Sequence, residues 1–445
     1  MKINAKLAWS PPRILVSGFA VIILLGAFLL TLPFASSSGT RLSLVDALFT
    51  ATSATCVTGL VVVDTGSYFS VAGQVILMAL IQLGGLGFMT MATLIALVFR
   101  KRISLKERLV LQEAMNQSSM EGIVRLIRRV IIYSLSIELV GAVLFASRFA
   151  ADMPLGKAIY YGVFHSISAF NNAGFDIFGG YRSLTLYASD PTVSITAILL
   201  VIFGGLGFVV MSDLLEWRHN RKLSLHSKVV LTVTGSLIAL GTIIIFVFEF
   251  SNPLTLGSLE WGGKVLSALF QSVMPRTAGY NSINLTELRQ ATQFFIIILM
   301  FIGASPGSTG GGIKTTTFAV LIGAVISMIR GREDIVLFRY RLAKDRIFKA
   351  LTITLLSLVL VIVVTMLLSM IEGQKFLFVL FEAVSAFATV GLTLGLTPEL
   401  SDASKLILAV TMFAGRLGLL TLAYALGPRT EKELYRHPEG KITIG

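Results

Sequence analysis

The chain has 445 residues, of which 55% are hydrophobic and 14% are charged, and its mean hydropathy is +0.83. A soluble domain of this length does not need so apolar a composition, so we predict an all-α integral membrane protein. The one cysteine, Cys56, excludes a disulfide framework within the chain and any cysteine-based metal cluster. A net charge of +13 would suggest nucleic-acid binding in a soluble protein, but its distribution here indicates membrane topology and no nucleic-acid partner.

Spanning a bilayer takes about 20 apolar residues. Eight segments meet this requirement, and they are 14–33, 72–99, 130–149, 192–215, 229–250, 294–329, 350–371 and 406–426. The sixth is interrupted by polar residues and glycines. Because seven further spans follow the first, we expect the first to be retained as a helix and not cleaved as a signal peptide.

Short polar segments separate the two spans of each successive pair. Each carries a phenylalanine, then small and hydroxyl residues, then one glycine: Phe49 to Gly59, Phe164 to Gly174, Phe270 to Gly279, and Phe381 to Gly391. The offset is ten residues in three segments and nine in the third. We therefore predict four tandem helix–pore loop–helix repeats around a pseudo-fourfold axis, covering 1–114, 115–226, 227–345 and 346–445.

Lysines and arginines gather after the second, fourth and sixth spans and at both ends of the chain. The segments that carry the glycines are sparse in them. By the positive-inside rule, both termini and the basic connections face the cytoplasm, and the four polar segments enter the membrane from outside.

Irregular backbone at membrane depth is tolerated only where it is buried in protein or lines a watery cavity. Four such segments can point carbonyl oxygens inward and replace the hydration shell of a cation. No acidic residue lies in the triplets that end at the glycines, which favours a monovalent cation such as potassium. The predicted filter residues are Thr55, Val57, Thr58, Gly59, Asn172, Ala173, Gly174, Thr277, Ala278, Gly279, Thr389, Val390 and Gly391.

The sixth span contains a proline, several glycines and a lysine. A glycine in a helix interior costs about 1 kcal/mol and a proline about 3 kcal/mol, so this segment should not be a continuous helix. We interpret it as a flexible gate formed by Gly303, Pro306, Gly307, Gly310, Gly311, Gly312 and Lys314. The shorter glycine patches at 84–87 and 204–207 are explained by close helix packing. A phosphate-binding loop is disfavoured because Ile313 separates Gly312 from Lys314 and no strand precedes the segment.

Charged and polar residues within the spans are few. Arg416 lies in an apolar run, where a cation costs at least about 2.5 kcal/mol, so it should face the pore or a partner group. It can act as an electrostatic barrier to ions, as an anchor for loop carbonyls, or as both. Glu138 could carry protons, although we favour a hydrogen bond between helices. The residues after the aligned phenylalanines should brace the pore helices or line the outer vestibule, and they are Thr50, His165, Gln271 and Glu382.

Thr389, Val390 and Gly391 resemble a shortened potassium-channel filter, and the fourfold repetition of single glycines resembles the Trk/Ktr/HKT superfamily over almost the whole chain. The absence of two additional N-terminal spans makes the chain most similar to its KtrB-type membrane subunits. The resemblance implies potassium uptake across the bacterial cytoplasmic membrane, with Arg416 near a gating loop. It also implies a homodimer on a cytosolic nucleotide-binding RCK ring of KtrA type, no cofactor in this chain, and sodium as a candidate stimulant.

A sodium- or proton-coupled cation symporter of the same fold remains an open alternative. An enzyme is not expected, because the sequence has no paired acids, no metal-ligand helix of histidine and glutamate, and no serine–lysine dyad at helical spacing.

In the family, glycine at all four filter positions accompanies potassium preference, and serine at the first accompanies sodium transport. We therefore expect Gly59→Ser to lower the preference for potassium over sodium. The relative uptake of the two ions in transport-deficient cells measures this, and an unchanged ratio in the variant would contradict it.

Overall fold

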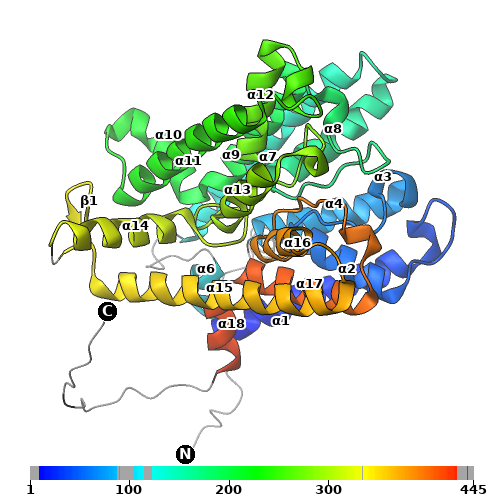
Figure 1. The fold of residues 1–445 in the computed structure, drawn as a ribbon. Helices are drawn as coiled ribbons and strands as arrows, with labels where there is room; N and C mark the ends of the chain where they lie inside the picture. Colours follow the sequence, from blue (N-terminus) through cyan, green and yellow to red (C-terminus); the bar gives the residue numbers. More distant parts are fainter. Residues whose placement is uncertain are drawn as a thin grey trace, which may run out of the picture.

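The computed structural model describes residues 10–87, 90, 105–114, 123–332, 334–427 and 438. Within these residues the protein is almost entirely helical (Figure 1), and the paired strands are limited to the hairpin of β1 (Val336–Leu337) and β2 (Tyr340–Arg341). In the described part of the chain, four helices are long and apolar enough to cross a membrane, or six if each sharply bent pair counts as one span. The chain is therefore an all-α membrane protein, and the count of eight spans remains a prediction.

The same order of elements occurs four times along the chain. A long helix comes first, as α1 (Pro11–Thr31), α7 (Ile123–Phe149), α11 (Leu225–Glu249) and α15 (Lys344–Glu372). A shorter helix then leads to the glycine, as α2 (Leu44–Thr55), α8 (Leu155–Phe170), α12 (Trp261–Val273) and α16 (Phe376–Ala388). A third helix, here called the return helix, follows as α4 (Val71–Leu86), α9 (Pro191–Leu206), α13 (Gln290–Phe301) and α17 (Asp402–Leu417).

Contacts between the four sets follow a cycle. Each return helix touches the short helix of the next set: α4 with α8, α9 with α12, α13 with α16, and α17 with α2. Figure 1 shows the consequence, since the first and last parts of the chain, in blue and orange, lie together although they are far apart in sequence. The aligned phenylalanines Phe49, Phe164, Phe270 and Phe381 are fully buried and fix the short helices in this arrangement.

Side-chain caps define where three of the return helices begin. Ser70 accepts a hydrogen bond from the backbone N–H of Gly73, Asp190 from those of Thr192 and Val193, and Ser401 from that of Ser404. Such caps satisfy N–H groups that have no partner within the helix. They fix the point at which the chain turns back from each glycine segment.

The same three return helices end at a glycine with positive φ: Gly87 at 81°, Gly207 at 90° and Gly418 at 84°. After Gly207 the chain bends by 100° into α10 (Phe208–Asn220), and after Gly418 by 96° into α18 (Leu419–Leu426). Continuous helices over 192–215 and 406–426 are therefore wrong, because these glycines adopt backbone angles that a helix does not. For the expected span 72–99, helix is described to Leu86, and most of the remainder lies outside the described residues.

The sixth span is interrupted as predicted. α13 ends at Phe301, residues 302–314 form a loop, and helix resumes as α14 (Thr315–Ile329), which lies alongside α15 (Figure 1). A bridge between Ile302 and Ile313 closes the neck of this loop. We call residues 302–314 the gate loop.

Close packing of glycines is also confirmed. A Cβ atom on Gly84 would collide with the carbonyl of Thr55, and one on Gly204 with that of Phe170. Gly415 has the same relation to Phe387. In the third set, a Cβ atom on the corresponding Gly303 would collide with the carbonyl of Gly311 in the gate loop. A carbonyl of the loop therefore occupies the position that a short-helix carbonyl has in the other sets.

Short elements complete the described chain. They are α3 (Thr65–Tyr68), α6 (Leu105–Ala114), and the 3-10 turns η2 (Pro33–Ala35), η3 (Thr185–Tyr187), η4 (Leu256–Ser258), η5 (Leu285–Glu287) and η6 (Thr397–Glu399).

One buried carboxylate organises the turn beyond α11. Glu249 accepts hydrogen bonds from Asn252 Nδ2 at 2.6 Å, Thr255 Oγ1 at 2.7 Å, the Arg289 backbone N–H at 2.9 Å and Thr292 Oγ1 at 2.5 Å. The start of α13 is thereby joined to the end of α11.

We expect Glu249→Ala to lower the free energy of unfolding by about 2–4 kcal/mol, because it leaves buried donors without an acceptor. Thermal unfolding in detergent measures the effect. Glu260→Ala is the control, since Glu260 is exposed and its side chain caps no N–H group of α12. Equal unfolding midpoints for the two variants would contradict the role given to Glu249.

Candidate functional site: a ring of four glycine segments above a loop

The four triplets that end at the aligned glycines meet in a closed ring. Each glycine lies so near the next triplet that an added Cβ would collide with the carbonyl of that triplet's middle residue. The pairs are Gly59 with Ala173, Gly174 with Ala278, Gly279 with Val390, and Gly391 with Thr58. Because the fourth pair returns to the first triplet, the ring closes. We call residues 57–59, 172–174, 277–279 and 389–391 the glycine ring.

The first residue of every triplet has a positive φ, which non-glycine residues rarely adopt. The values are 59° for Val57, 59° for Asn172, 77° for Thr277 and 51° for Thr389. Such a conformation costs about 1–3 kcal/mol, and it persists only where the surrounding structure enforces it.

Serines on two short helices hold the ring from behind. The backbone N–H of Gly59 donates to Ser53 Oγ at 3.1 Å, and that of Gly391 donates to Ser385 Oγ at 3.1 Å. Sequence reasoning missed both serines. The repeat contains the signal, because each lies six residues before its glycine.

Three buried hydroxyl groups in or next to the ring make no hydrogen bond among the described residues. Thr58 Oγ1 and Thr389 Oγ1 are buried and have no hydrogen-bond partner among the described residues, and neither has Thr55 Oγ1 at the end of α2. Hydroxyl and carbonyl oxygens are ligands suited to hard cations. The donor set therefore fits a cation that has lost part of its water shell.

The gate loop lies directly against the ring. Gly310 contacts Thr277 and Gly311 contacts Thr389 so closely that neither position can accept a Cβ without displacement. The loop is also bonded to the end of α9, where the N–H of Ser305 donates to the carbonyl of Gly205 at 3.0 Å.

Two cationic side chains hold the loop in place. Lys314 Nζ donates to the carbonyls of Gly310 at 2.7 Å and Gly311 at 3.2 Å. Arg416 donates to the carbonyls of Thr309, Gly84 and Gly85, so it joins the gate loop to the end of α4. These contacts agree with the expectation that Arg416 anchors loop carbonyls, and they leave its role as a barrier to ions untested.

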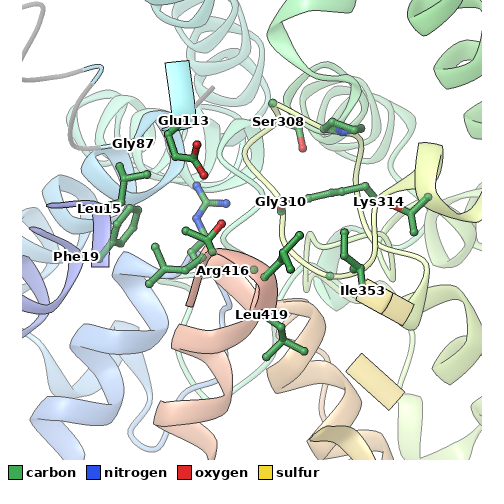
Figure 2. Close-up of a pocket in the computed structure, with 18 of the residues that line it drawn as sticks. Leu15, Phe19, Gly87, Glu113, Ser308, Gly310, Lys314, Ile353, Arg416 and Leu419 are labelled. Atoms are coloured by element: carbon green, nitrogen blue, oxygen red, sulfur yellow. Dashed lines mark hydrogen bonds between the residues drawn. The ribbon is translucent and has the colours of Figure 1, made fainter. Parts of the chain in front are cut away.

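A cavity of about 270 Å³ lies on the side of the gate loop away from the ring. Its lining includes Lys314, Lys349 and Arg416, together with Glu113 of α6. Figure 2 shows Arg416 and Lys314 on opposite sides of the loop segment that contains Gly310, with the Glu113 carboxyl turned toward the Arg416 side. The gate loop therefore contacts the ring and also lines this cavity, together with three cationic side chains.

The structure gathers all the predicted filter and gate residues into these two layers. Gly303 adjoins Gly311, and the carbonyl of Pro306 lies against Gly207. The carbonyls of Thr309, Gly84 and Gly85 were not predicted as partners of Arg416, because every residue has a backbone carbonyl and the sequence does not indicate which ones accept a hydrogen bond.

Two buried carboxylates outside the ring and the gate loop have hydrogen-bond partners. Glu138 accepts hydrogen bonds from Gln82 Nε2 at 3.1 Å and Asn171 Nδ2 at 3.0 Å, which confirms the bond between helices. Glu382 accepts from Thr393 Oγ1 at 2.8 Å and from Thr397 Oγ1. The equivalent residues of the other three segments are fully buried and so do not line an outer vestibule: Thr50, His165 and Gln271.

We expect Gly310→Ala to lower the free energy of unfolding by about 1–3 kcal/mol, because the added methyl collides with Thr277 and Ala304. The matched control is Gly235→Ala in α11, where a Cβ meets no atom within 4 Å. That substitution should stabilise the helix by up to about 1 kcal/mol. Chemical or thermal unfolding in detergent compares the two, and a shift of the same sign in both would contradict the packing described.

Comparison with known proteins places this chain in a family. The family model of TrkH, described as a cation transport protein, matches residues 12–430. "Ktr system potassium uptake protein B" of Bacillus subtilis is 44% identical over 444 residues, which covers 100% of this chain and 99% of the relative. "Potassium/sodium uptake protein NtpJ" of Enterococcus hirae is 38% identical over 454 residues, with 100% and 99% covered.

A solved structure has the same fold. The potassium transporter TrkH from Vibrio parahaemolyticus superposes with a TM-score of 0.75 over 96% of this chain and 87% of the other, at 19% identity. Together with the extent of the family match, these similarities show that the chain belongs to the TrkH family of cation transport proteins.

Proposed function

We propose that this chain takes up potassium across the cytoplasmic membrane of a bacterium through one pore formed by a single polypeptide, with the glycine ring as its filter. The observation that carries the proposal is the closure of four backbone triplets into one ring, with the first residue of each held at positive φ. The potassium uptake named for the Bacillus subtilis relative supports the choice of ion.

The chemistry of the ring supports a monovalent cation. Its four triplets contain no acidic residue, so the oxygens available are carbonyls and hydroxyls. Carbonyl dipoles can replace the water shell of potassium, whereas rings of carboxylates are a common device of cation channels with other selectivity. We assign the ring residues and Thr55 to ion binding.

Two acidic side chains in the connections after the first two triplets would concentrate cations near the filter. Burial raises the pKa of Asp176 to about 7, and the neighbouring negative charge of Asp64 adds to the rise. Burial by itself would raise the pKa of Asp64 as well, but hydrogen bonds from Ser67, Tyr181 and Gly180 outweigh it and lower that pKa. Asp64 is therefore the constant charge, while the charge on Asp176 grows as the pH rises through 7.

The gate loop is proposed to close the path below the filter. It fills the space under Thr277 and Thr389 and is held by Lys314 and Arg416 through backbone carbonyls. Opening would require these bonds to break, so the two cations set the stability of the closed state. A positive charge in the path would also slow each cation that passes.

The name of the Bacillus subtilis relative, a Ktr system protein, supports a proposal for the larger assembly. We propose four helix–pore loop–helix repeats at 1–114, 115–226, 227–345 and 346–445, eight spans, and both termini in the cytoplasm. A membrane subunit of a Ktr system implies a further component, for which we propose a cytosolic nucleotide-binding ring of KtrA type beneath a homodimer of this chain.

A second candidate is uptake coupled to sodium. The Enterococcus hirae relative, which is 38% identical, is named for potassium and sodium together. Uptake of radioactive rubidium by the purified protein in liposomes, with and without sodium, tests both candidates. Rubidium uptake that needs no sodium supports the potassium pore, and rubidium uptake that requires a sodium gradient supports coupling. No rubidium uptake under either condition would defeat both.

We expect Arg416→Ala to raise the rubidium flux in liposomes several-fold, because the gate loop loses its bonds to α4 and α17 and the path loses a positive charge. Arg289→Ala is the control, since Arg289 binds Ser251 at an exposed position away from the loop. Wild-type flux in a folded Arg416→Ala protein would contradict the gate.

A further inference from the structure

The residue after the ring glycine differs between the four segments. The first and fourth segments have Leu60 and Leu392, whereas the second has Phe175 and the third has Tyr280. Tyr280 is fully buried, and its hydroxyl donates to the carbonyl of Phe175 at 3.0 Å. A side chain of the third segment thus holds the backbone of the second.

The same carbonyl receives a second hydrogen bond. Ser168 Oγ of α8 donates to the Phe175 carbonyl at 2.8 Å. Ser168 lies six residues before Gly174, the position from which Ser53 and Ser385 bond to their glycines in the first and fourth segments. Because a carbonyl oxygen has two lone pairs, the pair of donors can saturate it and fix its direction.

Further contacts join the second and third segments. The side chains of Asn172 and Thr277, the first residues of their triplets, are hydrogen-bonded at 3.1 Å. Beyond the ring, the backbone N–H of Asn281 donates to Ser183 Oγ at 3.1 Å, and that of Leu184 donates to the Asn281 carbonyl at 3.2 Å. We call this set of bonds the second–third seam, and Tyr280 lies at its centre.

We infer that Tyr280 is a positioning residue for ion selectivity, which sets the separation of the second and third filter segments through its hydroxyl. The inference rests on the proposed function of the ring as a potassium filter. Discrimination between potassium and sodium depends on the size and stiffness of the carbonyl cage. Loss of the Tyr280 hydrogen bond would loosen one side of that cage without removing any ligand of the ion.

Tyr280→Phe tests this inference, because it deletes one oxygen and keeps the buried ring. The readouts are the potassium-to-sodium uptake ratio in liposomes and the thermal unfolding midpoint in detergent. Tyr160→Phe is the matched control, since its hydroxyl also bonds between helices, to Gln74 Oε1 at 2.7 Å, but away from the ring. We expect the potassium-to-sodium uptake ratio to fall about two- to tenfold in Tyr280→Phe, because the net free energy of one hydrogen bond corresponds to a factor of about this size. The ratio should stay at the wild-type value in Tyr160→Phe, with similar midpoints in both.

Ser168→Ala gives a second and independent measurement, because it removes the other donor to the Phe175 carbonyl. It should move the ratio in the same direction, and it decides the question if Tyr280→Phe does not fold. A wild-type ratio in a folded Tyr280→Phe protein overturns the inference, and so does an equal fall in Tyr160→Phe. If the wild-type protein itself does not prefer potassium, the proposed function fails and the inference falls with it. If the wild-type protein prefers potassium and the variant has the same uptake ratio, the inference about Tyr280 fails while the proposed function stands.

Discussion

Backbone contact between four short segments is the constraint on which the rest of the structure depends. At the glycine ring each segment touches the next with no side chain between them, so each contact requires a residue without a Cβ. Close backbone packing also occurs outside the ring. There the return helices touch carbonyls at or near the ends of the short helices, through Gly84, Gly204 and Gly415. The buried phenylalanines behind these contacts keep the four segments at one level.

The third set of helices departs from the other three, and this difference places the gate loop against the ring. In the other three sets the return helix runs to a glycine with positive φ, and in the second and fourth sets the chain then bends sharply. In the third set α13 ends at Phe301 and the gate loop follows. Lys314 and Arg416 satisfy carbonyls that no helix can satisfy there. Burying a cation costs less free energy when backbone oxygens accept its hydrogen bonds than when it has no partner. Because Lys314 and Arg416 make these bonds to the gate loop, the position of the loop depends on these two side chains.

Much of this arrangement could be predicted from the sequence, because four phenylalanine-to-glycine segments between apolar runs have few other interpretations. The interruption of the sixth span could also be predicted, from its proline and glycines. The bends at Gly207 and Gly418 were not, since a short glycine patch in an apolar run suits a packed helix as well as a bent one. The partners of Arg416 were also hidden, because they are backbone carbonyls brought together only by the fold.

A ring made from one polypeptide has a genetic consequence. In a channel built from four identical subunits, one mutation changes all four positions at once, whereas here it changes one quarter of the ring. Each quarter can therefore differ from the others, and the described contacts do differ. Serines bond the glycines of the first and fourth segments, while a tyrosine from the third supports the second. A single substitution can thus alter one quarter of the ring while the other three quarters stay chemically unchanged.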